Sequence, residues 1–234
     1  MLCHLSVVAQ INTDRVMMIG RNALYFEAYV LSIQYFNQVI NAKPYLHQPY
    51  FFRGLAKLNL EDYSGAEQDC SEAIQMNPFV VDYYQLRGLA RINQGKFKEA
   101  ISDYNQALIH APEDVGLWHN MVLCKMREKD YDGAREDVQR LLSISPHYVQ
   151  GYLMSAEVWM KQQDTLKAEA DINKALELDK YNPDSWSVRA MLYMKLEQFK
   201  EAEHDLGQAI HLASLNGGNY INRALARYHQ NNLR

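Results

Sequence analysis

The chain has 234 residues, of which 48% are hydrophobic and 22% charged, the composition of an ordinary soluble protein. Its formal net charge is −4, which argues against a nucleic-acid-binding protein because such proteins usually carry a basic excess or a basic patch. No stretch reaches the roughly 18 apolar residues that a membrane-spanning helix requires, so we expect no membrane span.

Residues 1–12 precede the regular part of the chain. The run MLCHLSVVAQ is apolar, ends in small residues at Val8 and Ala9, and is followed by polar INTDR, a pattern typical of the end of a secretory signal peptide. The positively charged start of such a peptide is absent, so this interpretation requires a start codon upstream of Met1. If residues 1–9 are a signal remnant, the protein is exported or periplasmic. The alternative is a frayed segment that covers the first helix of a cytoplasmic protein.

From residue 13 onward the sequence repeats with a period of 34 residues, and the clearest unit is 81–114. A shift of one period in either direction superposes matching residue types: Tyr84 on Tyr50 and Trp118, Ala100 on Ala66 and Ala134, and Pro112 on Pro78 and Pro146. A period of this length predicts a solenoid of stacked helical units.

Each unit contains two helical patterns. In 81–114 the first pattern places Tyr84 and Gly88 on one face, and Gly95 ends that helix because the residue after a helix often needs a positive φ angle. The second pattern begins at Phe97 and ends before Pro112, which lacks an N–H group and restricts the preceding residue. Small residues are expected where the two helices approach closely, at Gly88, Ala100 and Ala107.

This succession of aromatic, small residue, aromatic, alanine and proline resembles the tetratricopeptide repeat (TPR), in a tandem array of the bacterial type. The resemblance covers about nine-tenths of the chain in one register. It implies an all-α fold, an α-solenoid in the form of a right-handed superhelix, with six 34-residue helix-turn-helix units and one extra C-terminal helix. The units are expected at 13–46, 47–80, 81–114, 115–148, 149–182 and 183–216.

Residues 217–234 are expected to form either the first helix of a seventh unit or a capping helix. A cap should carry a polar outer face, because the last repeat of a solenoid otherwise leaves its packing surface open. This segment instead carries Tyr220, Ile221, Leu225 and Tyr228. The pattern therefore favours a fragment of a longer protein over a cap.

Two charged rows follow the same period. One position of the second helix holds Asp69, Asp103, Asp137, Asp171 and Asp205, and one position of the first helix holds Arg53, Arg87, Arg189 and Arg223. Because arginine can bind a carboxylate through two N–H groups, the rows predict a ladder of ion pairs, within a repeat or across to the next. Met121 and Ser155 interrupt the arginine row in the fourth and fifth units.

No arrangement of residues indicates catalysis, so we expect neither enzymatic activity nor a cofactor. Glu201 and His204 have the Glu-x-x-His spacing of di-iron bundles, but such a site needs a second copy of the motif and two further carboxylates. The sequence contains no second copy, which argues against a metal site. Cys70 and Cys124 fall on inward-facing helix positions and are interpreted as small buried thiols rather than as a disulfide pair.

The TPR resemblance also implies where a partner would bind. In such repeats the first helices line a concave groove, toward which positions 2, 5, 9, 12 and 13 of each unit point. Here these positions supply a mostly apolar floor: Met17, Phe51, Leu55, Leu58, Leu89, Ile92, Leu123, Met126, Leu153, Met160, Met191 and Met194. Position 13 changes from asparagine in the second and third units to a basic row, Arg127, Lys161 and Lys195. The alternative explanation of the floor is packing between neighbouring first helices.

These features predict a non-catalytic protein–protein interaction scaffold that binds a peptide or a helical segment of a partner in the groove. Methionine-rich surfaces adapt to their partners, and the basic row favours an amphipathic segment with acidic residues. The floor does not match TPR domains that clamp a C-terminal carboxylate with Lys, Asn and Arg. Two alternatives stay open: a self-assembling module that forms a homo-oligomer, and the interaction domain of a longer chain whose catalytic part is absent.

Overall fold

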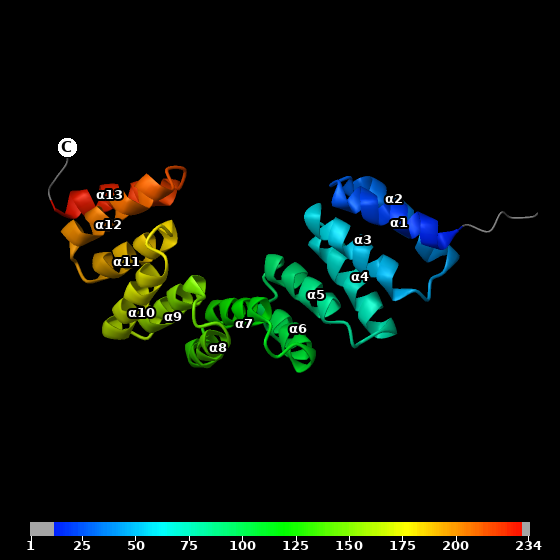
Figure 1. The fold of residues 1–234 in the computed structure, drawn as a ribbon, viewed down its shortest axis with the longest axis horizontal. Helices are drawn as coiled ribbons and strands as arrows, with labels where there is room; N and C mark the ends of the chain where they lie inside the picture. The colour runs from blue at the N-terminus through cyan, green and yellow to red at the C-terminus, as the bar shows by residue number, and fades with distance from the viewer. Residues whose placement is uncertain (1–11, 231–234) are drawn as a thin grey trace, which may run out of the picture. The chain divides into compact units, whose positions relative to one another are not determined.

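The computed structural model describes residues 12–230, so the signal remnant expected at residues 1–9 lies outside the described residues. Within the described range the regular secondary structure consists of thirteen α-helices without a strand (Figure 1). Six helix pairs are followed by one further helix. The all-helical repeat fold predicted from the sequence is confirmed.

First and second helices differ by one residue in length. The first helices have 13 residues each: α1 (Thr13–Tyr25), α3 (His47–Asn59), α5 (Val81–Asn93), α7 (Val115–Arg127), α9 (Val149–Lys161), α11 (Pro183–Lys195) and α13 (Gly217–His229). The second helices have 14: α2 (Tyr29–Ala42), α4 (Tyr63–Met76), α6 (Phe97–His110), α8 (Tyr131–Ile144), α10 (Thr165–Leu178) and α12 (Phe199–Leu212). None of these described helices has the length and hydrophobicity needed to cross a membrane.

The helices pack into two compact units. Unit 1 extends to Leu117 and unit 2 begins at Trp118, so the division falls inside α7. Within unit 1 each helix from α1 to α6 packs against the next, and the same holds from α8 to α13 within unit 2. Each unit therefore buries its own core.

Aspartate caps fix the start of several second helices. The carboxylates of Asp62, Asp130 and Asp164 accept hydrogen bonds of 2.9–3.1 Å from the backbone N–H group three residues further on. Such a bond satisfies one of the four N–H groups that a helix leaves unpaired at its start. The aspartate before each of these helices thus stabilises the helix start.

The turn between the two helices of a pair always contains one residue in the left-handed region. Gly95 has a φ angle of +75° there, as expected from the sequence. The same place in the other five turns holds Glu27, Glu61, Lys129, Gln163 and Glu197, with φ angles of +59° to +65°. A side chain in this region costs roughly 1–2 kcal/mol, so glycine relieves strain in one turn that the other five tolerate.

The end of the second helix does not depend on proline. In the first four units the helix ends two residues before the proline, as α6 does before Pro112. Units five and six have Lys180 and Ser214 instead, yet α10 and α12 end at the corresponding residues. After α10 the carboxylate of Asp179 accepts a 2.9 Å hydrogen bond from the N–H of Tyr181, and this local turn replaces the proline.

Small residues lie where helices cross, as predicted. Ala100 and Ala107 of α6 are completely buried. A Cβ atom added to Gly88 would lie 2.8 Å from Cζ of Tyr104, which is closer than real contacts allow. The tyrosine ring therefore packs directly on the backbone of α5, and the fold requires glycine at residue 88.

The arginine ladder forms both within and between repeats. The guanidinium groups of Arg53, Arg87 and Arg189 each bind the aspartate sixteen residues later in the same pair, at 2.6–3.2 Å. The Nη1 atom of each also donates to a polar side chain sixteen residues earlier, in the preceding pair: Asn37, Ser71 and Asn173 respectively. Each arginine thus joins three helices, which fixes the rotation between successive repeats.

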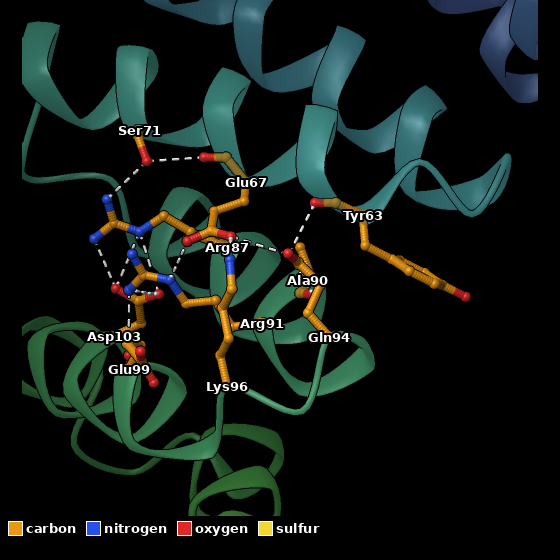
Figure 2. A network of polar contacts seen from close by, with 10 residues as sticks. All are labelled: Tyr63, Glu67, Ser71, Arg87, Ala90, Arg91, Gln94, Lys96, Glu99 and Asp103. Carbon is orange, nitrogen blue, oxygen red and sulfur yellow. Dashed lines mark hydrogen bonds and ion pairs between the residues drawn. The ribbon is translucent and has the colours of Figure 1, made fainter.

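A second polar network reinforces the ladder in unit 1. Figure 2 shows Arg87 and Arg91 converging on Asp103, while Arg91, Gln94 and Lys96 also reach Glu67 of α4. Burial raises the pKa of Glu67, but the hydrogen bonds from Lys96, Arg91 and Gln94 together outweigh that effect and lower it to about 2. The carboxylate is therefore ionised and links α4 to the pair that follows.

Candidate partner-binding site

The floor residues expected in unit 1 are half-buried. Phe51, Leu55 and Leu58 lie on α3, and Leu89 and Ile92 lie on α5, all partly exposed. The Phe51 ring packs against the rings of its neighbour Phe52 and of Tyr83, with centroid distances of 5.2 and 5.0 Å. These side chains contribute to helix packing and also present part of their surface to solvent.

The floor residues expected in unit 2 divide into two groups. Leu123, Met126, Met160 and Met194 are half-buried, whereas Met191 is 42% exposed. The basic row is exposed at Arg127, Lys161 and Lys195. Leu123 and Met126 pack against the buried cluster around Val122 and Val138, and Met160 packs against the cluster around Ile172.

One expectation for unit 2 needs correction. Leu153 is buried, with Ile172 and Val188 in the same core cluster, so it cannot contribute to a partner surface. The sequence rule placed it on the floor because it considers one helix at a time. The Nζ atom of the exposed Lys195 donates a 2.6 Å hydrogen bond to the backbone carbonyl of Met160.

A cavity of about 480 Å³ brings four of the expected residues together in unit 2, namely Leu123, Met126, Arg127 and Lys161. Six further residues line it: His119, Lys129, Tyr131, Gln150, Met154 and Glu157. Of these, Glu157 occupies position 9 of the fifth repeat, where the second, third, fourth and sixth repeats have leucine or methionine. A search restricted to apolar members of that position misses it, although the period alone identifies it.

Two ionisable side chains of this cavity, Glu157 and His119, have shifted pKa values. Burial raises the pKa of Glu157, an effect that the nearby charges of Lys161 and Arg127 oppose without cancelling. Burial lowers the pKa of His119, whose Nδ1 atom lies 3.1 Å from the hydroxyl of Tyr148. The cavity therefore holds a neutral histidine and a carboxylate whose charge is only partly compensated.

The other two cavities fit the partner hypothesis less well. One of about 720 Å³ lies over α1, is lined by Met17, Met18 and Phe52 among others, and contains only one of the expected floor residues, Met17. The other, of about 320 Å³, contains Glu201 and His204 beside Arg189. Across residues 12–230 no three His, Cys, Asp or Glu side chains are grouped so as to hold a metal ion.

The two cysteines within the described range are buried and free, as the sequence indicated. Burial raises the pKa of Cys70 and of Cys124 to about 12. At neutral pH both are thiols rather than nucleophilic thiolates, and they serve as small packing residues.

A family model described as the middle TPR-like domain of cilia and flagella-associated protein 70 matches residues 86–213, which is more than half of the chain. The chain belongs to this TPR-like family. A second model, described as a tetratricopeptide repeat, matches residues 51–118 of the TPR chain. The expectation of a bacterial-type array stays a prediction, because the longer match carries the name of a ciliary protein. None of the curated proteins matches the sequence.

Solved structures share the fold of this TPR chain at low sequence identity. MamA from Desulfovibrio magneticus RS-1 is 16% identical with a TM-score of 0.70, covering 74% of this chain and 98% of its own. PilF of Pseudomonas aeruginosa is 15% identical with a TM-score of 0.70, covering 89% and 95%. YrrB, a TPR protein with an unusual peptide-binding site, is 15% identical with a TM-score of 0.63, covering 82% and 97%. At these identities the likeness concerns the fold.

Proposed function

We propose that the protein is a non-catalytic interaction scaffold that binds an extended or helical segment of a partner protein on the face formed by its first helices. The observation that carries this proposal is the half-buried state of the apolar floor residues, which remain partly exposed in both units. A floor needed only for packing would be fully covered, as Leu153 is. The peptide-binding site of the structurally similar YrrB lends support.

Burial of the partner's apolar face would supply most of the affinity. Each Å² of apolar surface removed from water contributes about 25 cal/mol before the cost of ordering the segment is subtracted. Met126, Met160 and Met194 have flexible side chains that can repack against different partners. The floor thus favours protein or peptide over nucleic acid as the ligand.

The basic residues would orient the partner rather than hold it. Arg127 and Lys161 are exposed, and exposed ion pairs contribute only about 0–1 kcal/mol each. An acidic stripe along one side of an amphipathic segment would match them. Since Lys195 is bound to a backbone carbonyl, its contribution should be smaller.

Paired substitutions test this proposal. Leu89→Asp together with Met126→Asp places a charge on the floor of each unit and should abolish partner binding while helicity measured by circular dichroism is retained. The matched control is Ile109→Asp with Leu166→Asp, which alters exposed apolar residues of second helices, again one in each unit. Capture of the same partners by the floor variant, quantified by mass spectrometry against the control, would show that the floor is not the binding surface.

A self-assembling module is the second candidate, favoured by the outer face of α13. Ile221 is 71% and Tyr228 62% exposed there, whereas Leu153, two repeats before Ile221, is buried and Met194, one repeat before Tyr228, is half-buried. Association through this face should give a mass above that of the monomer in light scattering across a concentration series. The variant Ile221→Asp with Tyr228→Asp should then restore the monomer.

The third candidate is an interaction domain within a longer polypeptide that also carries a catalytic part. Sequencing the transcript from its true start codon to its stop codon tests this directly. An additional enzyme domain in the reading frame would support it, and the floor would then recruit substrates or regulators to that domain.

A further inference from the structure

Position 9 of the repeat holds an acidic residue instead of an apolar one at one place in unit 2. Leu123 and Met191 hold this position in the fourth and sixth units, and Glu157 holds it between them. In unit 1 the second and third repeats have leucine at this position, Leu55 and Leu89. Glutamate at this position places a carboxylate among the apolar residues that line the 480 Å³ cavity.

The carboxylate of Glu157 is not neutralised by a direct contact. It is half-buried, and between residues 12 and 230 no hydrogen bond and no ion pair within 4.0 Å reaches it. The nearby Arg127 and Lys161 act on it only through longer-range attraction. A partly buried carboxylate without a donor is costly, because it has lost water without gaining a hydrogen bond.

We propose that this cavity accepts a basic side chain, lysine or arginine, of the partner segment against Glu157, while acidic residues beside it in the segment bind Arg127 and Lys161. The inference rests on the proposed function and deepens it by naming the partner's chemistry. The partner motif is thus a single basic residue flanked by acidic ones, rather than a uniformly acidic stripe.

A basic side chain satisfies the cavity better than the other choices. Its aliphatic stem can pack on Leu123, Met126 and Met154 while its charged head donates to the carboxylate. An apolar side chain would cover Glu157 without giving it a donor, and an acidic one would repel it. The flanking cations attract acidic residues at the rim, where both are exposed.

The corresponding place in unit 1 gives an internal comparison. Two periods earlier in the sequence, Leu89 stands in place of Glu157. Asn59 and Asn93 likewise stand in place of Arg127 and Lys161. That part of the floor carries no charge at these positions and suits an apolar side chain. The two units would therefore recognise different residues of a partner, which makes the interaction selective for sequence.

Two synthetic amphipathic peptides test the proposal. Both carry glutamate on each side of a central residue, which is lysine in one and the uncharged norleucine in the other. Fluorescence anisotropy with the full chain should show the lysine peptide binding at least about tenfold more tightly, as expected for a charge-assisted hydrogen bond in a partly buried site. Glu157→Leu should reverse the preference and Glu157→Gln should abolish it. Glu136→Gln, which changes an exposed carboxylate of α8 outside the cavity, should leave it unchanged.

Methionine methyl signals in NMR locate the binding event. Addition of the lysine peptide should shift the signals of Met126 and Met154, which line the cavity, and leave that of Met18 on α1 unchanged. Equal affinity for both peptides, an unaltered preference in Glu157→Leu, or shifts confined to Met18 would each overturn the inference. So would the failure of both peptides to bind. The proposed function stands or falls separately, on whether the floor variant Leu89→Asp with Met126→Asp loses cellular partners.

Discussion

Asp171 of α10 faces Ser155 of α9, although the same position in three other repeats is bound by an arginine. Burial raises the pKa of Asp171, and the hydrogen bonds from Ser155 and Trp159, which favour the charged form, only partly offset this effect. The Oδ2 atom of this carboxylate is buried and without a hydrogen-bond partner. The ladder is therefore interrupted at a carboxyl group that keeps its place in the repeat without an arginine beside it.

We expect Asp171→Asn to stabilise the protein at neutral pH. A carboxyl whose pKa is raised in the folded state stabilises the fold below its unfolded pKa, and this contribution is lost as the pH rises through the folded pKa. The fold thus disfavours the charged form of Asp171, and replacement of the carboxyl by a neutral amide should raise the free energy of unfolding by roughly 0.5–1.5 kcal/mol. Urea unfolding monitored by circular dichroism measures the change.

The same substitution where the ladder is intact should have the opposite sign. Asp103→Asn removes the carboxylate that Arg87 binds and one of the two that Arg91 binds, Glu67 being the other. Burial raises the pKa of Asp103 as it does that of Asp171, but Asp103 has two arginine partners that its loss would leave with fewer contacts, so the variant should lower the free energy of unfolding by roughly 1.5–3 kcal/mol. Equal destabilisation by Asp103→Asn and Asp171→Asn would show that the missing arginine has no energetic effect.

Ala100→Leu should overpack the crossing of α5 and α6. Ala100 is completely buried, so added methyl groups force shifts that cost roughly 1–3 kcal/mol. Thermal unfolding should show a lower midpoint for this variant, whereas Ala42→Leu at the exposed end of α2 serves as control and should change little. Unchanged thermal stability of Ala100→Leu would contradict the close helix contact.

Glu67 should make the stability of unit 1 depend on acidic pH. Its pKa falls from 4.5 to about 2 in the folded state, so its stabilising effect is complete above about 4.5 and is lost as the pH falls toward 2. Glu67→Gln should remove this part of the pH dependence and lower stability at neutral pH. Glu72→Gln on the same helix is the control, and thermal unfolding at a series of pH values compares the two. Parallel pH profiles for both variants would rule out a special role of Glu67.

Lys161→Glu should weaken partner binding more than Lys195→Glu. Lys161 lines the cavity, whereas the Nζ atom of Lys195 is engaged by the carbonyl of Met160. Both effects should be modest, roughly 0–1 kcal/mol, and larger at low salt because exposed charges are screened. Association rates measured by surface plasmon resonance at two salt concentrations provide the comparison. A larger effect from Lys195→Glu would place the partner further toward the C-terminal repeats.

The fold could be predicted from the sequence because the residue pattern that specifies it repeats at a fixed period. A period of 34 residues assigns each residue to one face of one helix, and this is enough to place Ala100 at a crossing and Arg87 in line with Asp103. The glycine turn at Gly95 follows as well, since a positive φ angle is a local property. Local patterns of this kind act within one helix pair and need no knowledge of its neighbours.

The proposed binding surface could be outlined only with the tertiary structure, because exposure depends on neighbouring repeats. Leu153 and Met126 satisfy the same sequence rule, yet the helices around α9 bury the first and leave the second in a cavity. The role proposed for Glu157 likewise depends on packing, because α7 places Arg127 near α9, which carries both Glu157 and Lys161. Helix periodicity states which way a side chain points, whereas the packing of the adjacent helix decides how much of that side chain a partner can reach.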